Sequence, residues 1–169
     1  TIIFNSEFNE ELDIELISDF KKLIFSNYEL NEKIFECYAN NNFNSLKFKT
    51  NKFNQNVSVL PHNLIQLIFG RCFNRDVSVL PPFLTHLTFC DFFNQDVSSL
   101  PPTLTHLTFG HCFNQDVSSL PPTLTHLTFD HCFNQGVSFL PLTLTHLTFG
   151  YCFNQQYNIP PNIKYLKLN

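Results

Sequence analysis

The sequence THLTFGHCFNQDVSSLPP, residues 105–122, returns almost unchanged as THLTFDHCFNQGVSFLPL, residues 125–142. A recurring Phe-Asn dipeptide keeps the same spacing of 20 residues along most of the chain. These dipeptides are found at positions 53–54, 73–74, 93–94, 113–114, 133–134 and 153–154. A strict period of this size is typical of solenoids, in which each repeat forms one coil that buries its apolar side against neighbouring coils. The sequence therefore predicts a stack of coils.

One coil contains a short strand followed by turns. Leu107 and Phe109 alternate with His106 and Thr108, and a period of two is typical of a strand with one buried face. The consecutive prolines that follow lack N–H donors and favour an irregular, polyproline-like segment. Stacked coils then form a parallel sheet with about 4.8 Å between strands. We expect seven strands, at about residues 43–48, 64–69, 84–89, 104–109, 124–129, 144–149 and 163–168.

The pattern LxxLxFxxCFN…LPP resembles the leucine-rich repeat segment LxxLxLxx(N/C)xL, with Cys112 at the position that takes Asn or Cys. The Phe-Asn dipeptide together with LPPTLTHLTFG resembles, more specifically, the FNIP repeat family of social amoebae and giant viruses, over residues 43–168. The resemblance implies a right-handed leucine-rich-repeat-like solenoid. Its parallel β-sheet would line the concave face, and an irregular, polyproline-rich side would form the convex face.

The first part of the chain shows a different pattern. Apolar residues at spacings of three and four predict an amphipathic helix over residues 8–27 and a second, shorter helix over residues 29–41. We therefore expect an α-helical N-terminal cap at residues 1–42 and a solenoid of about seven coils at residues 43–169. The cap would shield the open end of the apolar core from water.

A second interpretation of the same helices comes from the family resemblance. FNIP-repeat proteins often carry an N-terminal F-box, a helical module that docks onto the adaptor of a cullin-type ubiquitin ligase. Residues 8–38 are of a suitable type for a degenerate F-box, although they are short and lack the Leu-Pro start of that module. The chain would then be the substrate-recognition subunit of the ligase, with the ligase adaptor as a partner.

Three residue types recur at positions that predict structural ladders. The phenylalanines of the Phe-Asn dipeptides should form a stacked aromatic spine, and the asparagines should satisfy backbone groups of the turn and the next coil. Cysteines at one position of the repeat should point inward as small apolar side chains. These cysteines are Cys72, Cys112, Cys132 and Cys152.

The strand residues that point away from the core form the candidate binding site. Imidazoles and hydroxyls recur there in register, and Tyr165 closes the row at its end. The candidate residues are His86, His106, His126, His146, Thr88, Thr108, Thr128, Thr148 and Tyr165. Metal binding by the histidines is an alternative, but zinc needs ligands that converge on one point and a straight ladder diverges. We expect no metal site and no cofactor.

Composition narrows the remaining classes of function. The net charge is −4 with no basic block, which argues against nucleic acid as the main partner, and no apolar run is long enough to cross a membrane. The six cysteines and the absence of a secretory signal pattern favour reduced thiols and an intracellular, cytoplasmic location, in a host cell if the protein is viral. No catalytic motif is present. We therefore expect a protein that is not an enzyme and that binds an unidentified protein partner through the concave face.

Overall fold

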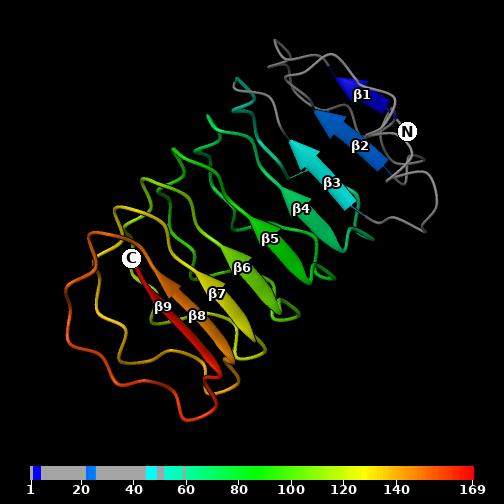
Figure 1. Cartoon of the computed structure of the whole chain (residues 1–169). Helices are drawn as coiled ribbons and strands as arrows, with labels where there is room; N and C mark the ends of the chain where they lie inside the picture. The colour runs from blue at the N-terminus through cyan, green and yellow to red at the C-terminus, as the bar shows by residue number, and fades with distance from the viewer. Residues whose placement is uncertain (1, 5–21, 26–44, 49–51, 59) are drawn as a thin grey trace, which may run out of the picture.

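The computed structural model describes residues 2–4, 22–25, 45–48, 52–58 and 60–169. Its strands form one parallel sheet whose order in space follows their order in the sequence (Figure 1). The strands are β1 (Ile2–Phe4), β2 (Lys22–Phe25), β3 (Ser45–Phe48), β4 (Gln66–Ile68), β5 (His86–Thr88), β6 (His106–Thr108), β7 (His126–Thr128), β8 (His146–Phe149) and β9 (Tyr165–Leu168). The parallel β-solenoid that the period predicts is confirmed.

From β4 to β9 the strands are shorter than the sequence predicts, because a turn precedes each of them. In the coil of β6, the N–H of Leu104 donates to the carbonyl of Pro101 at 3.2 Å, which closes a turn that begins with the proline pair. Only His106, Leu107 and Thr108 then have strand geometry. Leu107 pairs in register with Leu87 and Leu127 on the neighbouring strands, so equivalent side chains stack directly on one another.

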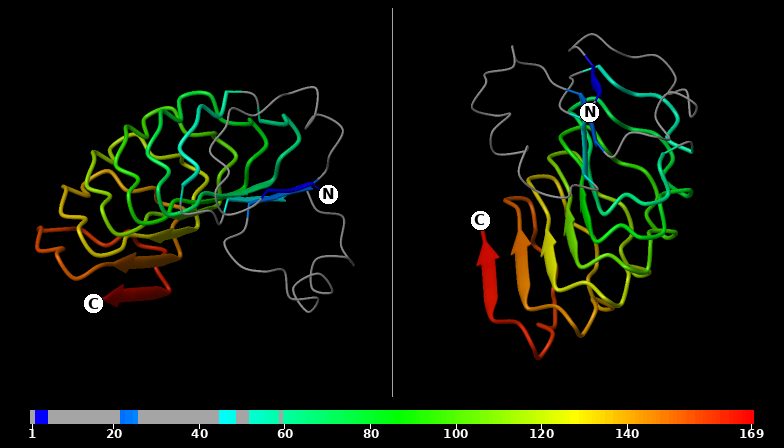
Figure 2. Two further views of the ribbon diagram at one scale, coloured as in Figure 1. Left: turned by 90° about the horizontal axis from the view of Figure 1, so that it is seen from above. Right: turned by 90° about the vertical axis from the view of Figure 1, so that its right-hand side faces the viewer.

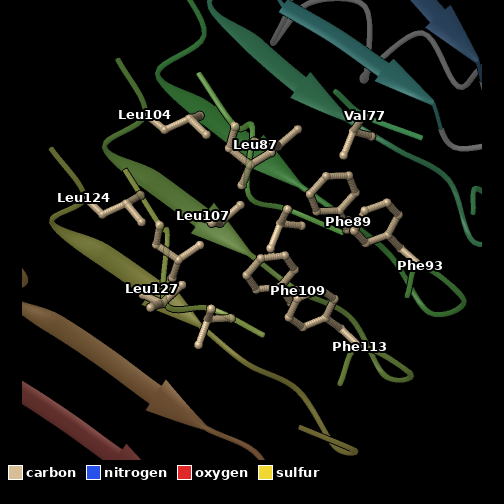
Figure 3. Packing of buried hydrophobic residues seen from close by; sticks show 14 of the residues in the cluster. Val77, Leu87, Phe89, Phe93, Leu104, Leu107, Phe109, Phe113, Leu124 and Leu127 are labelled. Carbon is tan, nitrogen blue, oxygen red and sulfur yellow. The ribbon is translucent and has the colours of Figure 1, made fainter. Parts of the chain in front are cut away.

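Each complete coil contributes two phenylalanine rings to the core. The rings of Phe109 and Phe113 stack within one coil with centroids 3.7 Å apart, and Phe113 stacks on Phe93 of the preceding coil at 6.1 Å (Figure 3). Leu87, Leu107 and the residues around them complete the buried cluster. The predicted aromatic spine is confirmed. The strand phenylalanine of each coil, such as Phe109, forms a second stack of rings beside it.

The asparagine ladder is confirmed as well. The Oδ1 atom of Asn114 accepts the backbone N–H of Asn134 in the next coil at 2.8 Å, and the same bond recurs between the other asparagines of the described coils. Gln135 of the next coil also donates to Asn114. Among the residues that the structure describes, no buried side-chain nitrogen or oxygen lacks a hydrogen-bond partner. The ladder thus satisfies backbone groups that stacking would otherwise leave unpaired.

The distance between equivalent rings depends on where they lie in the coil. The centroid distance is 4.1 Å for His106 and His126, on the side of the sheet that faces away from the core. It is 5.5 Å for Phe109 and Phe129, and 6.1 Å for Phe113 and Phe133. Coils therefore lie closest at the histidine side and diverge toward the turns. The solenoid curves accordingly, with the strands along its inner side and the connecting segments along its outer side (Figure 2).

The expected α-helical N-terminal cap is not supported. Strand β2 lies inside the segment that was expected to be helical, at residues 8–27, and it pairs with β3 through Leu23–Leu46 and Phe25–Phe48. The sequence Leu-Ile-Phe of β2 is found again at residues 67–69, in and just after strand β4. Its apolar residues therefore follow the strand pattern of the repeat. The second expected helix, and most of the F-box segment, lie outside the described residues.

The cysteine prediction was wrong. Cys72, Cys112 and Cys132 are half-buried, Cys152 is exposed, and none of the four belongs to the core cluster. The stacked rings of Phe109 and Phe113 already fill the space between the strand and the following turn. Cys112 therefore remains at the edge of the turn, where its backbone N–H donates to the carbonyl of Asp91 at 2.7 Å.

Candidate binding face of the sheet

The four histidines at the start of strands β5 to β8 form one continuous stack. Ring centroids of successive imidazoles are 4.1 Å apart and their planes differ by 10° to 12°. All four side chains are half-buried, because each imidazole covers its neighbours. The prediction that these histidines leave the core and align on the outer side of the sheet is confirmed. We call this row, His86, His106, His126 and His146, the histidine ladder.

Each imidazole is held in position by the threonine that precedes it. The hydroxyl of Thr105 lies 2.9 Å from Nδ1 of His106, and the corresponding distances in the other three coils are 2.8 or 2.9 Å. The Thr105 hydroxyl also lies 3.1 Å from the carbonyl oxygen of Thr85 in the preceding coil. The sequence analysis missed this contact, although the recurring Thr-His dipeptide was a signal for it.

Burial and mutual proximity disfavour the charged form of these imidazoles. Partial burial lowers the pKa of His86, His106 and His126, and other imidazoles of the ladder lower it further. Like charges at this separation repel, so full protonation of the ladder is disfavoured. His86, His106 and His126 therefore favour the neutral form.

A second row runs along the same face beside the histidine ladder. Thr88, Thr108, Thr128 and Thr148 pair in register and are half-buried. At the far end, Tyr165 and Lys167 of β9 pair with His146 and Thr148, and both are exposed. The Tyr165 ring stacks on His146 with centroids 5.9 Å apart. The structure thus brings all nine candidate residues onto one side of the sheet.

The other chemistry-bearing residues of the repeat lie apart from this face. His111 and His131, which follow the strands, form their own exposed stack with centroids 4.7 Å apart. Within the described residues, no group of three or more His, Cys, Asp or Glu side chains could hold a metal ion. In the histidine ladder the ring planes are nearly parallel, so neighbouring lone pairs do not converge on a common point as zinc ligands must.

The last coil contains a feature that the sequence analysis did not predict. A pocket of about 480 Å³ is lined by Ser138, Gln155, Gln156, Tyr157 and Asn158. This coil is one residue shorter than the others, and Tyr157 takes the place of the buried valine of earlier coils. The shortened coil was the only signal for the pocket in the sequence.

These features define the class of protein. A parallel sheet with one strand per coil, a recurring LxxLxF strand and an asparagine ladder is the architecture of leucine-rich-repeat-like solenoids. No helix in the described part of the chain is long and apolar enough to span a bilayer.

The FNIP Repeat family matches the chain at residues 53–92, 73–112, 93–132 and 113–152, and the chain belongs to this family. It is also similar to CroV588, a giant-virus protein described as a novel circular LRR protein structure. The two chains share 34% sequence identity with a TM-score of 0.64, over 87% of this chain and 25% of that one. This chain therefore spans about a quarter of the length of that neighbour. No curated protein matches the chain.

Proposed function

We propose that the protein is a non-catalytic scaffold that binds a protein partner through the face carrying the histidine ladder. The observation that supports this function best is the continuity of that face. Four successive strands present identical half-buried side chains in register, without an intervening loop or turn. A continuous inner surface of this kind is what solenoid proteins use to bind extended partners.

The chemistry of the face also favours binding over catalysis. Threonine hydroxyls do lie within hydrogen-bond distance of imidazoles, but the described strands β4–β9 carry no carboxylate that would orient an imidazole as a base, as the third group of a nucleophilic site does. Nothing in this arrangement would activate one hydroxyl over its copies in the neighbouring coils. An array of identical groups is better suited to making many similar contacts along one partner.

A peptide-display selection with matched variants tests the proposal. The chain is used to select binders from a displayed library of random peptides, and the binders are then retested on a variant with Thr108→Trp and Thr128→Trp. These two indoles project from the proposed face and would obstruct a partner. Binding should fall by about tenfold or more, as expected when a central contact surface is blocked.

The control variant carries Ser99→Trp and Ser119→Trp. Both serines are exposed on the outer turns, and the equivalent position already holds an exposed aromatic residue, Phe139. Binders retained by this control and lost by the first variant would support the proposal. Binders lost equally by both variants, or by neither, would refute it, provided that circular dichroism shows both variants folded.

A further inference from the structure

We infer that the histidine face takes an extended acidic peptide segment of its partner, because the face presents hydrogen-bond donors and no carboxylates. This inference rests on the proposed function and specifies its ligand. It follows from three features of the face: the proton positions on the ladder, the absence of acids along the strands, and the regular spacing of the donors.

The proton positions follow from the hydrogen bonds around one carbonyl group. The oxygen of Thr85 accepts the backbone N–H of Thr105 at 2.9 Å and that of His106 at 3.0 Å. Two N–H donors occupy both lone pairs of a carbonyl oxygen. The Thr105 hydroxyl at 3.1 Å would be a third donor to the same atom, so its hydrogen is better placed on Nδ1 of His106, at 2.9 Å.

A neutral imidazole that accepts a hydrogen bond at Nδ1 carries its own proton at Nε2. The same arrangement of carbonyl, two N–H donors and hydroxyl recurs at His126 and His146. The ladder therefore offers a row of Nε2–H donors toward the partner. Successive rings are 4.1 Å apart and nearly parallel, so the donors point in a common direction.

The charges on this side of the sheet are complementary to an acidic ligand. In strands β4–β9 and the residue before each of them, the outward positions hold His, Thr, Gln, Ile, Tyr and Lys, with Lys164 and Lys167 at the end. The acids lie elsewhere, although the chain has a net charge of −4. Asp91 and Asp130 follow the strand ends, and Asp91 pairs with Arg71 at 2.9 Å.

A row of aspartates lies on the turns that follow the Phe-Asn dipeptides. Asp76, Asp96 and Asp116 each accept the hydroxyl and the backbone N–H of a serine two residues later, and these bonds lower the pKa of each carboxyl. The aspartates on these turns therefore stay ionised at pH 7 and repel large polyanions. A short acidic segment that contacts only the sheet avoids this row, which is why we favour a peptide over a nucleic acid.

The length of the ladder suits a short extended segment. Such a chain advances about 3.4 Å per residue, so about four residues would run the length of the ladder, and alternate side chains, about 6.8 Å apart, would face the imidazoles. A carboxylate beside an imidazole favours its protonated form. The threonine hydroxyl allows this protonation, because it can rotate to accept Nδ1–H and then share the carbonyl 3.1 Å away with the two N–H donors. Bound acid should thus add positive charge to the face.

Fluorescence anisotropy with a labelled penta-aspartate peptide tests the inference. At about 50 mM salt, penta-aspartate should bind at least about tenfold more tightly than penta-asparagine, since charge-assisted hydrogen bonds are roughly twice as strong as neutral ones. Its affinity should rise by about fivefold or more between about pH 7.5 and pH 5.5, as the imidazoles take up protons. The groups that face the ladder over this range are Gln66, Tyr165, Lys164, Lys167 and the ladder itself.

Two double variants separate the face from a general charge effect. His106→Phe with His126→Phe keeps the ring stack and removes two donors, and should weaken binding by about tenfold. His111→Phe with His131→Phe removes two stacked histidines beyond the strands and should change affinity by less than about twofold. Equal loss in both variants, no binding of penta-aspartate, or equally tight binding of a thymidine oligonucleotide of the same charge would overturn the inference.

The tautomer can be observed directly. Two-bond ¹H–¹⁵N NMR spectra at pH 7.5 should show the ladder histidines with the proton on Nε2, and a proton on Nδ1 in the neutral rings would contradict the argument. The acidic-ligand inference can also fail while the proposed scaffold function holds. Displayed binders that are lost by the Thr108→Trp, Thr128→Trp variant but lack acidic residues would retain the scaffold function and reject the acidic ligand.

Discussion

Two stacks of aromatic rings lie on opposite sides of the sheet in the described coils, and they differ in what surrounds them. Phe113 is fully buried and stacks on rings both within its coil and in the neighbouring coils. His106 belongs to a stack that also recurs every 20 residues, but its side chain is half-buried. Duplication of a coil copies both rows equally. Burial therefore distinguishes a row that stabilises the fold from one that is available to a partner.

The largest effect should come from truncating the buried stack. Phe113→Ala removes a ring with no exposed surface and should lower the free energy of unfolding by about 3–5 kcal/mol, because it loses apolar burial and leaves a cavity. Urea denaturation followed by circular dichroism measures this change. Phe113→Leu is the matched control and should cost less than about half as much. An unchanged midpoint in Phe113→Ala would show that the stack does not support the core.

A smaller effect is expected at a glycine that has no room for a side chain against the preceding coil. A Cβ atom added at Gly110 would overlap the backbone carbonyl of Cys90 in the preceding coil, whereas one added at Gly136 would meet nothing within 4 Å. Gly110→Ala should therefore destabilise the fold by about 1–3 kcal/mol. Gly136→Ala should be neutral or stabilise it by up to about 1 kcal/mol, since it restricts the unfolded chain. Thermal denaturation of the two variants measures this difference. A higher melting temperature for Gly110→Ala than for Gly136→Ala would contradict the assignment.

Removing one member of the asparagine ladder should cost about 1–2 kcal/mol. Asn114→Ala leaves the partly buried N–H of Asn134 without its 2.8 Å acceptor, and an unmet donor carries a desolvation penalty. Asn114→Asp keeps an oxygen at the same position and should retain part of the stability. Amide hydrogen exchange at Asn134 provides a local readout, and it should accelerate in the alanine variant more than in the aspartate variant.

The histidine row should contribute least to stability at pH 7 and should become unfavourable in acid. The pKa of His86, His106 and His126 is lower in the folded chain than the ordinary value of about 6.5. The unfolded chain then binds more protons, so the free energy of unfolding falls as the pH drops below about 6.5. Denaturant titrations between about pH 7.5 and pH 5 should show this fall in the wild type.

The double variant His106→Phe, His126→Phe should show a shallower fall over the same range. The aspartates of the turns act in a separate window, because hydrogen bonds to serine lower their pKa and their contribution is lost only in stronger acid, below about pH 4. Parallel pH curves for the wild type and the double variant between pH 7.5 and 5 would contradict the role assigned to the histidines.

The repeat was sufficient to predict the solenoid, the core spine, the asparagine bonds and the outward direction of the histidines. Each follows from a period of 20 residues combined with alternation along a strand, which needs no knowledge of distant contacts. The N-terminal prediction failed because Leu23 fits both the helical spacing from Phe20 and the strand alternation of Leu23 with Phe25. Only pairing with Leu46 and Phe48, which depends on an adjacent coil, distinguishes the two.

The site was less accessible to sequence reasoning. The contact between the Thr105 hydroxyl and His106 depends on a carbonyl group that lies one coil away, and no local pattern reports on it. The exposure of Cys112 likewise depends on how two phenylalanine rings share the space behind the strand. The sequence shows which residues occupy equivalent positions in successive coils. It does not show which of several neighbouring side chains fills the space behind the strand.

The unequal spacing of the coils determines how such an array extends. Equivalent rings are 4.1 Å apart on the imidazole side and 6.1 Å apart near the turns, and small differences per repeat accumulate along a solenoid. Each added coil would therefore continue the same arc and would lengthen the row of imidazoles along its inner side.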